Sequence, residues 1–402
     1  MNVKKKFDDL RHILYRQKVK WLYNSSVGKS LRQSIWKVAG AEDGVSTLLM
    51  ERSRIFDHHG MNHIHDARIV ALFHHENTTW SMQRDAIYLL AGDITIEPEN
   101  SLAYLSGNRF FLPTRSNAHD YLVPNAVKDF VHRTLRNKYT HYDSLIHLDG
   151  FVGKNLYHFF DESVNALLLL FKDGTTDFTI PLLINQKVYH APYVQYVLAL
   201  PEFKDLRVVV QQPGEWIKVN HLYKATPSYA LWPDCYELMA RHVIKKPHRR
   251  IFLNRKPSFQ RRLSNNEAIE AIVKRHNFEI VYAEDLTYIQ QVQMFAETEY
   301  FVGLHGAGFT NLIYSDLARV HVLEIFSESL VHPHYYWYLE LLKINYYDAV
   351  MGSPLDVNWN YGLNEAQFSK QMELMFAHEA RFVVPDGAAG FSWSVLKNSV
   401  MV

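Results

Sequence analysis

The sequence is poor in cysteine and in long apolar segments. Cys235 is the single cysteine among 402 residues, so no disulfide can form within the chain, and a reducing compartment is expected. No run approaches the roughly 20 apolar residues that a membrane-spanning helix needs. No continuous apolar core follows the lysines at positions 4–6, so we expect no cleavable signal. The protein is therefore expected in the cytoplasm, either free or peripheral at the inner face of the cell membrane.

Net charge is also nearly absent, at +1 for the whole chain. A balance so close to zero, without an RNA- or DNA-binding motif, argues against nucleic acid as a partner. The charge is unevenly placed, because residues 1–37 hold ten Lys or Arg and two Asp, a balance of +8, which leaves −7 for the rest. The excess of basic charge is thus concentrated at the start of the chain.

The N-terminal segment 1–37 also has a regular apolar pattern. Five apolar residues recur at helical spacing on one side of it: Val3, Phe7, Leu10, Leu14 and Trp21. This pattern predicts a basic amphipathic helix, which suits an anionic membrane surface. A solvated helix that packs on its own domain is the alternative.

Length and composition predict two domains. An apolar content of 48% over 402 residues is enough for two cores, at roughly 150 residues per domain. We place a first domain at 38–235 and a second at 236–402. Two late stretches, 335–342 and 365–377, predict helices that return across the cleft between the domains.

The predicted secondary structure changes along the first domain. Short apolar runs predict a small β-rich layer with strands at 67–73, 86–90, 94–96 and 102–105. Alternation of strands and helices then begins. Strands are predicted at 145–148, 178–184 and 206–210, and helices at 156–171 and 193–200. A crossover near 220–245 leads into the second domain.

The second domain alternates strands and helices regularly. Short apolar runs predict strands at 250–254, 278–282, 300–304 and 320–326. Amphipathic stretches between them predict helices at 266–276 and 286–297. Such a series forms a parallel sheet with helices on both faces, and ligands bind at the carboxyl ends of its strands.

Residues 305–308, His-Gly-Ala-Gly, separate the third of these strands from a helix start. A loop of this kind directs backbone N–H groups and the positive end of a helix dipole at one place, and glycine lets a ligand approach closely. The backbone at Gly306, Ala307 and Gly308 is therefore the expected phosphate site. Side-chain donors would come from three neighbours: His305, Thr310 and Asn311. A tight glycine turn without a ligand is the structural alternative.

A basic stretch precedes this loop. Residues 241–262 hold nine Lys or Arg and no Asp or Glu. Arg255 directly follows the strand at 250–254, which should lie beside the glycine strand, so its guanidinium can reach the same phosphate. A solvated basic surface is the alternative.

Glu324 lies inside the apolar strand at 320–326, where a carboxylate needs partners. Two interpretations stay open. Glu324 can accept hydrogen bonds from the ribose hydroxyls of a nucleotide, or it can pair with a nearby basic residue.

Four motifs follow one another between residues 251 and 326. They are a strand followed by Arg255, then Arg262 and Asn265, then a Leu286-Thr287-Tyr288-x-x-Gln291 helix, then 305–311. In order and composition they resemble the C-terminal half of glycosyltransferase family 61. Three mild departures occur: Thr287 for Ser, Tyr288 for Phe and Phe309 for Leu. Ordered motifs over about 75 residues are a stronger signal than a glycine loop alone.

A further match lies at residues 155–162, Asn-Leu-Tyr-His-Phe-Phe-Asp-Glu. It resembles the family's Asn-x-x-His-x-x-x-Asp element at a helix start. Asn155, His158 and Glu162 share one helical face and can converge on one substrate, whereas Asp161 lies about 100° around the helix. The resemblance therefore implies Asn155 as a substrate ligand and leaves Asp161 and Glu162 as alternative bases, with His158. The structural alternative is that the two acids favour the first helical turn and His158 fills the core.

The resemblance implies an α/β fold of the GT-B type, with two facing Rossmann-like domains. It also implies an inverting hexosyl- or pentosyltransferase that moves a sugar from a nucleotide-sugar donor, expected to be a UDP-sugar, to a glycan or lipid-linked acceptor. A role in bacterial surface polysaccharide biosynthesis, such as capsule assembly, fits the expected location. The donor would be bound by Arg255, Arg262, His305 and the glycine loop, with Glu324 at the ribose.

Metal ligands are not apparent. The 22 histidines include close pairs such as His332 and His334, but no thiol cluster accompanies them. The Asp-x-Asp spacing typical of glycosyltransferases that hold a nucleotide-sugar through a divalent ion is absent from the sequence. We therefore expect neither a required metal nor a tightly bound cofactor.

Two other classes of function are alternatives. A dinucleotide-dependent oxidoreductase would carry Gly-x-Gly-x-x-Gly with an acid about 20 residues later. Gly303, Gly306 and Gly308 do not have that spacing, although Glu324 lies near that distance. A non-catalytic glycan-assembly module with the same fold would bind nucleotide weakly or not at all.

Overall fold

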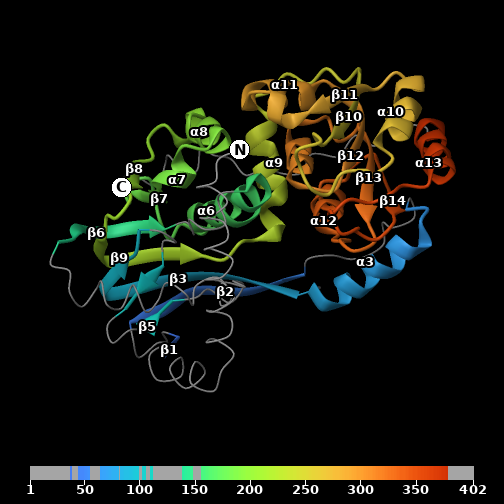
Figure 1. Cartoon of the computed structure of the whole chain (residues 1–402). Helices are drawn as coiled ribbons and strands as arrows, with labels where there is room; N and C mark the ends of the chain where they lie inside the picture. The colour runs from blue at the N-terminus through green and yellow to red at the C-terminus, as the bar shows by residue number, and fades with distance from the viewer. Residues whose placement is uncertain are drawn as a thin grey trace, which may run out of the picture.

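The structure is a computed structural model that describes residues 37–38, 44–54, 64–80, 82–98, 102–105, 109–111, 138–147 and 155–378. Figure 1 shows two α/β lobes, one built mainly from the first half of the chain and one from the second. The amphipathic helix predicted for segment 1–37 lies outside the described residues. Within the described part, no helix is both long and apolar enough to span a bilayer.

The first lobe contains a mixed sheet in the order β1-β5-β4-β3-β9-β6-β7-β8, and β2 also pairs with β3. Its β9-β6-β7-β8 part is parallel, whereas β2, β3 and β9 pair antiparallel. The strands are β1 (Lys37–Val38), β2 (Val45–Arg54), β3 (Met82–Ile96), β4 (Ala103–Tyr104), β5 (Arg109–Phe110), β6 (Thr140–His147), β7 (Leu182–Asn185), β8 (Val208–Gln211) and β9 (Ile217–Ala225).

Helices cover the parallel part of this sheet. They are α5 (Leu156–His158), the π-helix η5 (Phe159–Val164), α6 (Asn165–Asp173), α7 (Gln186–Tyr189), α8 (Pro192–Leu198) and two 3₁₀ turns, η6 (Pro201–Phe203) and η7 (Tyr229–Leu231). The predicted helix at 156–171 is present, with a π turn in its middle. Helix α9 (Trp232–Ala240) then leads into the second lobe.

The second lobe is a five-stranded parallel sheet in the order β11-β10-β12-β13-β14. The prediction of an α/β fold with a parallel sheet is confirmed. Its elements are β10 (Arg249–Asn254), α10 (Asn266–Arg275), β11 (Glu279–Tyr282), η8 (Ala283–Asp285), α11 (Tyr288–Ala296), β12 (Thr298–Leu304), η9 (Ala307–Tyr314), β13 (His321–Ser327), α12 (His334–Leu341), β14 (Tyr346–Gly352) and α13 (Glu365–Ala377).

This strand order creates a topological switch point. From β10 the chain moves to one side to form β11 and later to the other side to form β12. The crossovers therefore diverge between β10 and β12, at the carboxyl ends of these two strands, which is the position of the ligand-binding crevice in open α/β sheets.

Two predictions about individual elements were wrong, and one strand was missed. Residues 67–73 form the start of helix α3 (Ala67–Trp80) instead of a strand, because Ile69 and Phe73 lie four residues apart on one fully buried helical face. The region 220–245 contains strand β9 as well as a helix. Strand β14 was not predicted, because Asp348 interrupts its apolar pattern even though this carboxylate is fully buried.

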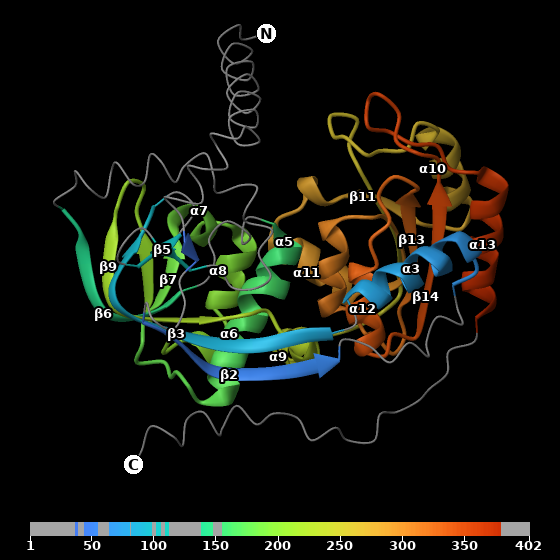
Figure 2. The same cartoon turned by 90° about the horizontal axis from the view of Figure 1, so that it is seen from below.

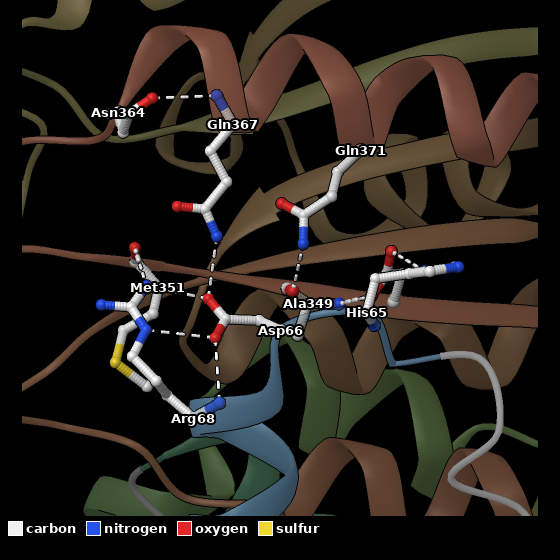
Figure 3. Close-up of polar contacts among 9 residues, drawn as sticks. His65, Asp66, Arg68, Ala349, Met351, Asn364, Gln367 and Gln371 are labelled. Atoms are coloured by element: carbon white, nitrogen blue, oxygen red, sulfur yellow. Dashed lines mark hydrogen bonds and ion pairs between the residues drawn. The ribbon is translucent and has the colours of Figure 1, made fainter.

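Helix α3 crosses from the first lobe to the second and lies beside β14 (Figure 2). The first domain predicted at 38–235 therefore contributes one helix to the other lobe. Figure 3 shows how the segment before α3 is attached: the Asp66 carboxylate accepts hydrogen bonds from Arg68 and from Gln367 of α13. His65 donates its backbone N–H to Asp348 of β14 at 3.0 Å, and its Nδ1 lies 2.9 Å from the same carboxylate.

One hydrophobic core continues through both lobes. Trp232 of α9 stacks on Tyr338 of α12 with 4.5 Å between ring centroids. Tyr236 of α9 donates its hydroxyl to the backbone oxygen of Ser315, just after η9. Of the two helices expected to return across the cleft, α12 packs against α9, whereas α13 packs on β13, β14 and α10 of its own lobe.

The packing of α3 gives a first prediction. Phe73 is fully buried against Phe326 and Tyr336 of the second lobe, with centroids 5.9 and 5.3 Å away. Phe73→Ala should lower the free energy of unfolding by about 3–5 kcal/mol through lost burial and a residual cavity. Leu72→Ala, next to it but 40% exposed, should change it by about 0.5 kcal/mol or less. Equal losses in denaturant titrations would contradict this attachment of α3.

Candidate active site

The switch point brings together Arg255, which follows β10, and His305, which follows β12. The Arg255 Nη2 donates to the backbone oxygen of His305 at 2.6 Å, and Nη1 donates to the backbone oxygen of Gln260 at 3.2 Å. Arg255 is thus placed where the sequence predicted, against the first residue of the glycine loop.

Arg255 forms no ion pair with a carboxylate among the described residues, although the charge of Glu284 lies within electrostatic reach. Burial, and then the nearby charge of Arg261, lower the pKa of the Arg255 guanidinium from its ordinary value. Both arginines also lie close enough to the rings of Tyr335 and Tyr361 to affect the pKa of these phenols. A half-buried cation held only by carbonyl oxygens, with a second cation beside it, favours an anionic ligand.

The glycine loop has a different geometry from the predicted one. Residues Ala307–Tyr314 form a 3₁₀-helix instead of the first turns of an α-helix. A Cβ on Gly306 would lie 2.5 Å from Arg255 Nη2, and a Cβ on Gly308 would lie 2.5 Å from Leu253 Cδ2. Gly306 therefore makes room for the guanidinium, and Gly308 lets the loop pack on β10.

His305 is held by a fully buried carboxylate. Its Nδ1 lies 2.6 Å from Oε1 of Glu324, and Tyr347 donates its hydroxyl to Oε2 at 2.5 Å. Of the two interpretations of Glu324, this geometry favours a basic partner, because both oxygens are engaged and none of the side chain is exposed. A carboxylate can only accept here, so Nδ1 carries the proton and Nε2 takes no part in this pair.

Thr310 and Asn311 turn inward instead of facing the loop mouth, with 0% and 1% exposure. The Asn311 Nδ2 donates to Oε1 of Gln291 in α11 at 3.0 Å, and Gln291 donates to the backbone oxygen of Ala283. Gln291 therefore fixes the position of Asn311, and this pair of side chains holds the loop against α11.

Two loops border the arginine pair, and sequence reasoning missed one of their residues. Arg262, the predicted ligand, accepts a backbone hydrogen bond from Tyr361, and its side chain has no partner in the described part of the chain. Arg261, its neighbour, is the arginine in electrostatic contact with Arg255 and has a left-handed backbone, with φ of 59°. Only its place beside Arg262 in the motif could have indicated it from sequence.

The first lobe presents the second part of the site at α5 and η5. Asn155 caps α5, because its side-chain oxygen accepts from the backbone N–H of Tyr157 at 2.9 Å. His158 and Glu162 form an ion pair on the open face, with 2.7 Å between Nδ1 and Oε1 and side-chain exposures of 43% and 27%. The hydrogen bond from Glu162 raises the pKa of His158 above its ordinary value, against the effect of burial.

Asp161 points the other way. It is 5% exposed, and Trp232 of α9 donates its Nε1–H to it at 3.3 Å. Adjacent positions on the helix thus separate the two acids: Asp161 lies against the helix that joins the lobes, and Glu162 lies beside His158.

Aromatic rings connect the two parts of the site. Tyr157 stacks on His334 and meets Tyr335 edge-on, with centroids 5.6 and 5.3 Å apart. Tyr335 lies 5.2 Å from the ring of His305, and His332 lies 6.3 Å from it. His158 and His305 therefore lie on two sides of one ring cluster at the junction of the lobes. No group of three or more His, Cys, Asp or Glu within the described residues is placed to hold a metal ion.

The site thus combines an arginine pair at the switch point with a His–Glu pair on the first lobe. The family model described as Glycosyltransferase 61 matches residues 156–321, which run from α5 to the start of β13. This match covers less than half of the chain and supports an assignment to glycosyltransferase family 61 and a glycosyltransferase activity. A search of curated proteins finds no match to the chain. The resemblance read from the motifs is confirmed, and the oxidoreductase and the non-catalytic module are set aside.

The His158–Glu162 pair gives a second prediction. Glu162→Gln removes the negative charge that favours the imidazolium, so the pKa of His158 should fall toward its ordinary value of about 6.5. Titration of the imidazole followed by NMR measures this change. Glu267→Gln on α10 is a control that should leave the titration unchanged. An identical pKa in wild type and Glu162→Gln would show that the pair does not form in solution.

Proposed function

We propose that the enzyme is an inverting glycosyltransferase of the GT-B type, which moves a sugar from a nucleotide-sugar to a glycan or lipid-linked acceptor. The observation that carries this proposal is the pair Arg255 and Arg261 at the switch point, neither of which forms an ion pair with a carboxylate among the described residues. A diphosphate would supply the missing negative charge. The donor then binds in the second lobe and the acceptor against the first.

Departure of the nucleotide needs stabilisation of the negative charge that develops on its diphosphate. Arg255 and Arg261 supply two cations at the switch point. His305 in its protonated form donates from Nε2, while Glu324 holds Nδ1 and fixes the orientation of the ring. These groups would replace the divalent ion that other glycosyltransferases use, so the proposal requires neither a metal nor a bound cofactor.

Inversion needs a base on the acceptor hydroxyl. The His158–Glu162 pair fits this role, because Glu162 engages Nδ1 and leaves Nε2 to take the proton. The carboxylate then stabilises the imidazolium that forms. Asp161 is the weaker candidate, since it is buried against Trp232.

The biological setting extends the same proposal. A UDP-sugar is the donor we favour, and bacterial surface polysaccharide such as capsule is the product. The basic segment 1–37, with its balance of +8, would hold the enzyme at the anionic inner face of the cell membrane. A lipid-linked acceptor would be available there.

Nucleotide binding tests the arginine pair. Arg255→Ala should weaken the binding of UDP by about 1.5–3 kcal/mol, the contribution of a charged hydrogen bond. Isothermal titration calorimetry measures the affinity. Arg249→Ala is the matched control, because Arg249 lies at the other end of β10 and pairs with Glu279 and Glu297. The proposal fails if Arg255→Ala binds UDP and the other nucleoside diphosphates as wild type does.

Turnover tests the assignment of the base. Glu162→Gln should reduce kcat by roughly 100-fold or more with nucleotide affinity unchanged, because a base acts on the acceptor. Asp161→Asn should reduce kcat less. The acidic limb of the pH–rate profile should lie above the ordinary pKa of His in wild type and move to lower pH in Glu162→Gln, because neutral His158 is the active form. A larger effect of Asp161→Asn at unchanged stability would assign the base to Asp161.

A further inference from the structure

Two loops at the carboxyl side of the second sheet are joined along their backbones. Residues 255–262 follow β10, and residues 353–361 follow β14. Arg261 N donates to Trp359 O at 2.6 Å, and Tyr361 N donates to Arg262 O at 3.1 Å. We call this pair of loops the paired tip; Figure 2 shows it projecting beside α10.

The paired tip has a fixed shape. Arg261 and Trp359, which share a backbone hydrogen bond, both have left-handed backbones, with φ of 59° and 62°. Residues other than glycine rarely adopt this conformation unless their surroundings hold them in it. The Asp356 carboxylate accepts the backbone N–H groups of Asn358 and Asn360 at 2.8 Å each, which holds the second loop.

This fixed shape exposes large apolar side chains. Phe259 is 49% exposed, Trp359 is 52% exposed and Val357 is 94% exposed. They lie on the two joined loops, where the backbone hydrogen bonds prevent either loop from folding back over them independently. Exposed apolar side chains at a rigid tip indicate a surface that binds a partner.

The charge of the paired tip indicates what kind of partner covers this surface. Its first loop contains four basic residues and no acid, and its second contains one acid, Asp356, whose Oδ1 binds backbone. Lys256 pairs with Asp285. Arg261 and Arg262 have no carboxylate partner in the described part of the chain. Apolar side chains, including Trp and Phe, beside unneutralised arginines match the interface of an anionic lipid bilayer.

The position of the paired tip relates this surface to the site. Arg255 Nη1 donates to Gln260 O within the first loop, so the tip begins at the switch-point arginine. Tyr361 ends the second loop and lies within electrostatic reach of Arg255 and Arg261. A bilayer that covers the tip would therefore lie beside the entrance to the crevice.

We propose that the paired tip inserts Phe259, Val357 and Trp359 into the interfacial region of an anionic membrane, while Arg262 faces the lipid phosphates and Arg261 remains with the donor site. This contact is separate from segment 1–37 and does not depend on the identity of the transferred sugar. It would place the crevice where a lipid-linked acceptor can reach it.

A site-specific label tests the contact in the full chain. Cys235 is buried, and burial raises the pKa of its thiol, so it should not react with a maleimide. Val357→Cys therefore takes a single environment-sensitive fluorophore. On vesicles of phosphatidylglycerol and phosphatidylcholine, the emission of the label should shift to the blue and be quenched by brominated acyl chains. The matched control, Ile244→Cys at a site 80% exposed, should show neither change.

A double variant tests the side chains themselves. Phe259→Ser with Trp359→Ser should lower the partition of the protein onto these vesicles by about tenfold or more and leave UDP affinity unchanged. A label at position 357 that stays in water while the protein is on vesicles would overturn the proposal, as would no binding to vesicles at all. Weaker UDP binding by the double variant would also overturn it, because the two rings would then belong to the donor site.

Discussion

The hydrogen bond from Arg255 to the backbone oxygen of His305 connects the two strand ends between which the ligand crevice opens. It joins β10 to β12 at the one place in the second sheet where neighbouring crossovers diverge. The bond occupies a donor of the arginine without neutralising its charge, because a carbonyl oxygen has no net charge to offset it. The charge of Arg255, with Arg261 beside it, is the physical reason why we propose a diphosphate there.

Several other features follow from keeping this arginine in place. A Cβ on Gly306 would meet the guanidinium of Arg255. A Cβ on Gly308 would meet the side chain of Leu253, which lies on β10 just before this arginine. Asn311 and Gln291 secure the loop from below, and Glu324 with Tyr347 orients His305. Across the junction of the lobes, Tyr157 and Tyr335 set the distance between this donor region and the His158–Glu162 pair.

Much of this arrangement was predictable from sequence because it depends on local order along the chain. Four of the five strands of the second sheet, the loop at 305–308 and the convergence of Arg255 on it follow from apolar runs separated by loop residues. The separation of Glu162 from Asp161 followed from helical geometry, although the π turn in η5 was not visible.

Features that depend on tertiary contacts were missed. Helix α3 was read as a strand because its apolar run is short, and its place on the second lobe depends on partners more than 250 residues away. Arg261 was passed over because its left-handed backbone, set by Trp359, has no sequence signal.

The account rests on a donor diphosphate in the crevice between β10 and β12, and a crystal structure with a bound nucleoside diphosphate tests this most directly. The account predicts phosphate oxygens within hydrogen-bond distance of Arg255, Arg261 and His305 Nε2, with the nucleoside in the second lobe. A diphosphate bound elsewhere on the chain, with Arg255 still bonded only to the backbone oxygens of His305 and Gln260, would contradict it.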